Sequence, residues 1–157
     1  MIGDLKDPNV ARQHPTDYLR GLEQSVRSAL REAGIAGNDV VGIGVDATAS
    51  TPIPLDEQGE PLAFCEAFEG HPAALAWLWK DHTSVAEAKE ITERAAVMRP
   101  AYLAACGGTY SSEWFWAKVL HCARTAPDVF EAANRWVELA DYIPFVLTGE
   151  IGPRLCA

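Results

Sequence analysis

Several features that mark common classes of protein are missing from this sequence of 157 residues. No apolar run reaches the roughly 18 residues that a membrane-spanning helix needs, and the first seven residues resemble neither a secretory signal nor a transit peptide. The 13 lysines and arginines are scattered singly in a chain of net charge -9. Because phosphate binding needs clustered basic side chains, we expect neither a nucleic acid nor a membrane as a partner.

Motifs for metal binding and for two common chemistries are also missing. The cysteines contain no C-x-x-C pair, so a zinc site is not indicated, and they are typical of free thiols in a reducing cytoplasm. No G-x-S-x-G elbow supports a hydrolase. Two glycines lie inside an apolar run rather than after it, which excludes a dinucleotide fingerprint or a P-loop there. The residues concerned are Cys65, Cys106, Cys122, Cys156, Gly42 and Gly44.

The segments that remain predict one α/β domain with a mainly parallel sheet. The length suits a single domain, and 48% hydrophobic residues indicate a globular chain. Residues 1–15 form an irregular, polar lead-in. Apolar residues at helical spacing predict a helix from Thr16 to the stop at Gly34, and the run 40–45 (VVGIGV) predicts a strand buried on both faces.

Later segments continue the alternation of strands and helices. Residues 51–64 predict a hairpin around a turn at 56–59, with Pro52 and Pro54 placing its first arm at an edge. A helix is expected from Ser111 or Ser112 to about residue 124, and another begins at Pro127. A short strand at 136–139 then precedes a helix at 141–147, in which Pro144 is tolerable only in the first turn.

Three stretches carry side chains suited to chemistry. Residues 46–51 (DATAST) follow the 40–45 run directly, and the carboxyl end of a buried strand is where α/β sheets open a ligand crevice. Residues 79–82 (WKDH) and 110–118 (YSSEWFWAK) combine tryptophan with polar groups, which suits the apolar face and hydroxyl edges of a sugar. The alternatives are a polar turn at 46–51, a helix cap at Asp81-His82, and tryptophans that belong to the core.

At these segments the sequence resembles the FGGY family of carbohydrate kinases. The matching stretches are 41–52 (VGIGVDATASTP), 78–83 (LWKDHT), 107–118 (GGTYSSEWFWAK) and 136–141 (WVELAD). The resemblance extends from about Gln13 to Gly149, and WKDHT and GTYSSEWFWAK resemble those members that phosphorylate ribulose in L-arabinose catabolism. It implies a ribonuclease-H-like, actin-type domain, incomplete at its N-terminal hairpin, that forms the sugar-side half of a two-domain kinase.

The resemblance also implies an activity and a set of substrate-binding residues. Such kinases transfer the γ-phosphoryl group of ATP, with Mg²⁺, to the 5-hydroxyl of a ketopentose in a cleft between domains. In glycerol kinases of the family, Arg, Glu and Arg stand at the positions of Ala49, Ser50 and His82, so small residues here make room for a longer substrate. The substrate-binding residues implied are Ala49, Ser50, Trp79, Lys80, Asp81, His82, Tyr110 and Glu113.

Other family parts have no counterpart in this sequence. Members begin with a phosphate-binding hairpin of D-F-G-T-x-S type, and their catalytic aspartate and nucleotide-binding domain fall past the position of Ala157. The resemblance therefore implies that residues 16–149 are a partial sugar-side domain and 150–157 a tail. It implies no catalytic residue or metal in this chain, and neither ATP nor Mg²⁺ bound by it alone. The implied partners are a ketopentose and the nucleotide-binding domain, with a homo-oligomer possible and a cytoplasmic location.

Two other interpretations stay open at this point. One is a degenerate kinase domain that binds a sugar without catalysis. The other is an unrelated acidic α/β domain in which every tryptophan is core.

Overall fold

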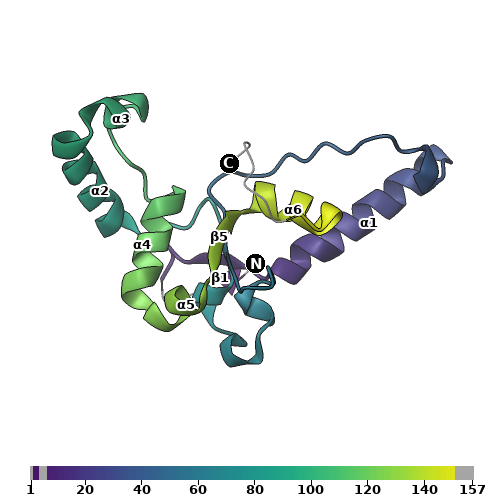
Figure 1. Cartoon of the computed structure of the whole chain (residues 1–157), viewed down its shortest axis with the longest axis horizontal. Helices are drawn as coiled ribbons and strands as arrows, with labels where there is room; N and C mark the ends of the chain where they lie inside the picture. The colour runs from purple at the N-terminus through teal and green to yellow at the C-terminus, as the bar shows by residue number, and fades with distance from the viewer. Residues whose placement is uncertain (1, 4–6, 151–157) are drawn as a thin grey trace.

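The computed structural model describes residues 2–3 and 7–150. Within these residues, five short strands form two small sheets: β1 (Ile2–Gly3), β2 (Ala11–Gln13) and β4 (Ala76–Trp77) in the order β1-β2-β4, and β3 (Pro52–Leu55) with β5 (Arg135–Glu138). Six α-helices of the described part lie on two sides of them (Figure 1): α1 (Pro15–Ala33), α2 (Val85–Met98), α3 (Pro100–Ala105), α4 (Phe115–Thr125), α5 (Pro127–Ala132) and α6 (Leu139–Thr148). None of these helices has the length and apolar character to cross a membrane.

The α/β class is confirmed, whereas the expected parallel sheet is not seen among the described residues. All three strand pairings there are antiparallel. The lead-in is also better ordered than predicted, because β2 pairs with β4 through Arg12 opposite Trp77 and Gln13 opposite Ala76. Ala11 and Arg12 are buried. A strand of three residues is too short to show an alternating pattern in the sequence.

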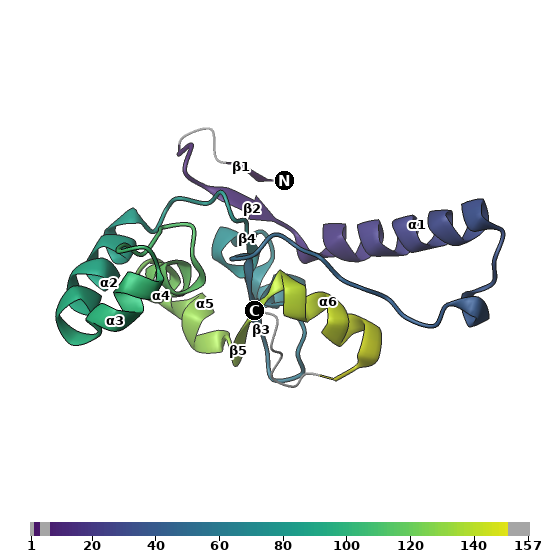
Figure 2. The same cartoon turned by 90° about the horizontal axis from the view of Figure 1, so that it is seen from above.

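Helix α1 follows the prediction closely. It ends at Gly34, whose φ of 66° is the left-handed conformation that glycine adopts most easily, and its first turn is capped by His14, whose ring accepts a hydrogen bond from Thr16 N–H at 3.2 Å. Only its first half contacts the core, through Tyr18, Leu19 and Leu22. The second half extends away from the sheets in both views (Figures 1 and 2).

The prediction of a buried strand at 40–45 was wrong. These residues form no strand, and Val41 and Ile43 are 103% and 58% exposed. They run back from the end of α1 towards the sheets (Figure 2) and line an open hollow with Val26 and Leu30 of α1. An apolar run indicates a strand because such a run usually has neighbours to bury it; among the described residues this one has none on a sheet.

The later elements match the prediction with small shifts. The turn at 56–59 forms, and Asp56 N–H donates to the Glu60 carbonyl at 2.9 Å, but residues 62–64 adopt a 3₁₀ turn instead of a second arm. Helix α4 begins at Phe115, three or four residues later than expected. Helix α6 begins at Leu139 and contains Pro144 beyond its first turn, because its start lies two residues before the predicted one.

Two buried clusters hold these elements together. One joins β3, β4 and α6 through Ile53, Leu55, Ala76, Tyr142 and Ile143, among others. The second joins β4 to α4 and α5 and contains Trp77, Cys122 and Val129. Strand β4 contributes to both clusters, so the residues that follow it, 78–82, leave the core from a fixed position.

Candidate sugar-binding site

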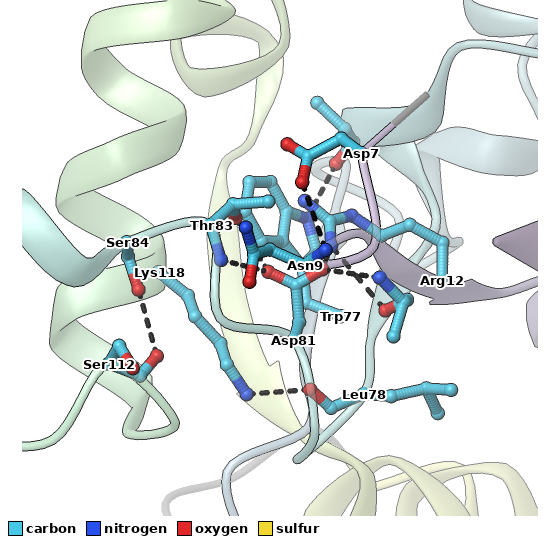
Figure 3. A network of polar contacts seen from close by, with 12 residues as sticks. Asp7, Asn9, Arg12, Trp77, Leu78, Asp81, Thr83, Ser84, Ser112 and Lys118 are labelled. Atoms are coloured by element: carbon cyan, nitrogen blue, oxygen red, sulfur yellow. Dashed lines mark hydrogen bonds and ion pairs between the residues drawn. The ribbon is translucent and has the colours of Figure 1, made fainter. Parts of the chain in front are cut away.

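Asp81 is buried completely and holds the chain after β4 in place. One carboxylate oxygen pairs with the Arg12 guanidinium and accepts Ala11 N–H at 2.7 Å. The other accepts Thr83 N–H at 3.2 Å and Thr83 Oγ1–H at 2.6 Å. Figure 3 shows Arg12, Thr83 and Asp81 converging beside the ring of Trp77. With both oxygens occupied and no exposed surface, Asp81 has no face for a ligand, so we assign it a structural role rather than the implied substrate contact.

The same anchor places Trp79 at the surface. Asp81 N–H donates to the Leu78 carbonyl at 2.9 Å, which closes a turn with Trp79 and Lys80 at its tip. The indole of Trp79 is 47% exposed, whereas Trp77 is 1% exposed. The alternative that all tryptophans are core is therefore wrong, since Trp116 is 64% exposed as well.

His82 and Glu113 come together from two different stretches. His82 Nε2 lies 3.6 Å from Glu113 Oε1, and both side chains keep about 40% of their surface exposed, at 42% and 38%. The other ring nitrogen, Nδ1, is 3.2 Å from Ser112 Oγ. The neighbouring Ser84 hydroxyl donates to the Ser112 carbonyl at 2.8 Å, which ties the two stretches together (Figure 3). A donor and an acceptor that are both accessible can bind adjacent hydroxyls of one sugar.

The turn that carries Ala49 and Ser50 is fixed from both sides of its backbone. Ser50 has a φ of 58°, a left-handed conformation that is uncommon for serine. The N–H of Ser50 donates to Glu138 Oε1 at 3.1 Å, and the N–H of Thr51 donates to Glu138 Oε2 at 2.8 Å. On the other side, Lys118 Nζ donates to the Ser50 carbonyl at 2.6 Å. Ala49 is exposed and Ser50 half-buried at the surface of this turn.

Burial shapes the charges beneath the turn. It lowers the pKa of Lys118 to about 7, an effect that the negative charge of Glu138 partly opposes. Burial also raises the pKa of Glu138, against the hydrogen bonds from Thr51 N–H and the charge of Lys118. Sequence reasoning missed both residues as parts of the site, because contacts between α4, β5 and the turn give no local signal. The sequence singles out the stretch that contains Lys118, but it does not indicate that this lysine binds the carbonyls of Ser50 and Leu78.

Tyr110 lies on the α2 side of these residues. Its ring packs edge-on against Trp114 with the centroids 4.9 Å apart, and its hydroxyl accepts Trp116 N–H at 3.2 Å. Burial raises its pKa. Together with Ser112 and residues of α2 it lines an open hollow of about 370 Å³, and the same Ser112 hydroxyl lies 3.2 Å from His82 Nδ1.

Two further observations concern metal-ligating and cationic side chains. Within residues 2–3 and 7–150 no three His, Cys, Asp or Glu side chains are grouped to hold a metal ion. The buried cations Arg12 and Lys118 are engaged by Asp81 and by two carbonyls, and neither is accessible to a phosphate.

Comparison with known proteins identifies the class and then the family. The fold matches that of "a xyloylose kinase from Brucella ovis" with a TM-score of 0.76 at 21% identity, over 94% of this chain and 28% of that one. It is thus the fold of a region of a sugar kinase. The chain belongs to the FGGY family of carbohydrate kinases, whose N-terminal domain it matches over residues 3–154.

The chain is also similar to parts of curated ribulokinases. A ribulokinase from Shouchella clausii is 41% identical over 98% of this chain, and one from Vibrio parahaemolyticus is 44% identical over 91%. A third, from Mycolicibacterium smegmatis, is 40% identical over 88%. The chain spans 28%, 26% and 25% of these three proteins, about a quarter of their length.

Proposed function

We propose that this chain forms part of the sugar-binding site of a ribulokinase, an enzyme that transfers the γ-phosphoryl group of ATP to the 5-hydroxyl of ribulose. The similarity to three ribulokinases supports the substrate, and one structural observation supports the site. His82 and Glu113, whose side chains are 42% and 38% exposed and lie 3.6 Å apart, offer paired polar groups beside a stretch that carries an exposed Trp79.

The proposed site combines three kinds of contact. The exposed indole of Trp79 offers an apolar face for the C–H side of a sugar. His82 and Glu113 offer a donor and an acceptor for its hydroxyls, and the small side chains of Ala49 and Ser50 would make room for a longer substrate. Lys80, half-buried at the tip of the same turn as Trp79, adds a positive charge. Asp81 and Arg12 support this surface without contacting the substrate.

The test uses the product of the longest reading frame that encodes this chain, called the full-length product below. We expect ADP release in a coupled assay with Mg-ATP to depend on L-ribulose, and to be weaker with D-xylulose or glycerol. Glu113→Gln should raise the KM for ribulose, whereas Glu57→Gln, in the exposed turn at 56–59, should leave it unchanged. ADP release that is equal with and without every sugar refutes the proposal.

A sugar-binding protein without catalysis is the competing function. Ribulose binding in titration calorimetry together with no ADP release from the full-length product would establish it. The isolated 157-residue chain serves as a further comparison, and we expect it to release no ADP with ribulose.

A further inference from the structure

Lys118 joins two stretches that are far apart in the sequence. Its side chain extends from helix α4 and is 0% exposed. Its Nζ donates hydrogen bonds to the carbonyl of Ser50 at 2.6 Å and to that of Leu78 at 2.8 Å. The Leu78 contact is visible in Figure 3. Ser50 lies in the turn before β3, and Leu78 directly precedes Trp79. One ammonium group therefore sets the separation between the turn and the tryptophan.

The contacts of Lys118 are unusual for a buried lysine. A buried charge is normally compensated by an opposite charge in direct contact, yet the hydrogen-bond partners of Nζ among the described residues are two backbone carbonyls. Smaller, neutral donors can also satisfy a carbonyl, although a charged donor makes the stronger hydrogen bond. A charged side chain that bridges two loops is costly for stability alone, which suggests that the bridge serves the geometry of the loops.

Glu138 completes the arrangement from the other side. Its two oxygens take the N–H groups of Ser50 and Thr51, while Lys118 takes the Ser50 carbonyl. The backbone of Ser50 is thus held on both its N–H and its C=O in a conformation with φ of 58°. Backbone in such a conformation persists where its surroundings determine it, and this is common at ligand sites.

We propose that Lys118 is a positioning residue of the sugar site, which fixes the Ser50 turn against the Trp79 stretch so that both meet the same ligand. The proposal rests on the function proposed above. A misplacement of about 1 Å can reduce turnover by roughly 100-fold. Because Lys118 bridges the two stretches proposed to bind the sugar, loss of the bridge should affect the binding of the sugar and leave that of the nucleotide unchanged.

The experiment compares Lys118→Met with Val129→Ala in the full-length product. Methionine keeps the length of the side chain but donates no hydrogen bond. Val129 is a fully buried residue of α5 that packs in the cluster with Trp77 and Cys122. For Lys118→Met we expect the KM for ribulose to rise roughly 10- to 100-fold with the KM for ATP within about twofold of wild type. Val129→Ala should lower the melting temperature and change neither KM.

A second measurement reads the turn without any ligand. Hydrogen exchange at the Ser50 and Thr51 amides should be faster in Lys118→Met and unchanged in Val129→Ala. If Lys118→Met does not fold, Glu138→Gln carries the same comparison, because it keeps the side-chain size and weakens the same turn.

Three outcomes separate the two proposals. A higher ribulose KM with faster exchange supports the positioning role. A lower melting temperature with wild-type ribulose KM overturns it and reduces Lys118 to a structural residue, while the proposed function stands. A wild-type protein without ribulose-dependent turnover overturns both, and the exchange rates then report a purely structural bridge.

Discussion

Two tryptophans separated by one residue provide a direct test of the site. Trp77 is 1% exposed and Trp79 47% exposed, so truncation of each to alanine should affect different properties of the full-length product. We expect Trp77→Ala to impair folding and Trp79→Ala to impair sugar binding.

The expected loss of stability for Trp77→Ala follows from its contacts. The indole N–H donates to the Ala73 carbonyl at 2.9 Å, and the Arg12 guanidinium lies 3.4 Å from the ring centroid. Truncation of a buried tryptophan costs about 3–5 kcal/mol, and a desolvated cation–π contact contributes up to about 2 kcal/mol. Loss of the ring should therefore reduce the unfolding free energy by at least about 3 kcal/mol, a large part of the stability of an ordinary domain.

For Trp79→Ala the expected loss of stability is smaller, about 1–2 kcal/mol, because half of the side chain is already in water. Its effect on the ligand should be larger. An aromatic platform at a binding site is worth about 1–3 kcal/mol, which corresponds to a roughly 10- to 100-fold higher dissociation constant for ribulose. Trp116→Ala, the removal of another exposed tryptophan on α4, is the matched control and should leave the affinity unchanged.

Denaturant unfolding and ribulose titration of the same samples decide between the possibilities. A large loss of unfolding free energy in Trp79→Ala, with unchanged ribulose affinity in the folded fraction, would remove Trp79 from the site. An equal loss of affinity in Trp116→Ala would show that the titration reports a general effect of tryptophan removal.

Three further changes test the anchors of the site. Asp81→Ala leaves the buried Arg12 charge without its partner, so we expect chemical denaturation to show a loss of about 3–5 kcal/mol; a loss below about 1 kcal/mol would contradict the structural role. Ser50→Gly relieves a φ of 58° and should be neutral or stabilising by up to about 1 kcal/mol, whereas Ser50→Val should destabilise by about 1–3 kcal/mol, and the reverse order in thermal melts would contradict the strain. Burial lowers the pKa of Lys118 from its ordinary value of 10.5 to about 7. Between these pH values the unfolded chain holds a proton that the folded chain has released, so stability rises with pH. Relative to Lys118→Met, wild type should gain about 2 kcal/mol from pH 7 to pH 9, and a constant difference would show that Lys118 does not titrate there.

The sequence predicts the fold best where the signal is local. Helix α1 and its end at Gly34 follow from apolar spacing and from one residue that favours a left-handed conformation. Pro127 marks the start of α5 for a similar reason, since proline fits the first turn of a helix. In each case the residues that determine the structure lie within the element itself.

Prediction fails where a partner determines the structure. Residues 40–45 are apolar on every position, but a strand exists only through pairing, and no described segment pairs with them. The spacing of Ser84 and Glu87 is that of a capping box at the start of α2. The Ser84 hydroxyl instead donates to the Ser112 carbonyl, and Glu87 Oε2 lies 3.0 Å from His121 Nδ1. Neither alternative partner is visible within the helix sequence.

The candidate site divides in the same way. Aromatic and polar composition singled out Trp79, His82 and Glu113, and the structure brings the last two together. Composition does not indicate that Asp81 differs from its neighbours, although Asp81 is fully buried. Lys118 and Glu138 act on backbone atoms of a turn 68 and 88 residues away, and no spacing rule extends over that range.

These same long separations determine when the site forms during folding. The hydrogen bonds of Lys118 and Glu138 close loops of 40, 68 and 88 residues, and such contacts repay their loop-closure entropy only after nearer contacts exist. The turn at Ser50 should therefore be absent from the transition state, while α4 and α5 form early. Substitution of Lys118 should then accelerate unfolding and leave the folding rate unchanged, so the sugar site would be the first part of the domain to open and the last to close.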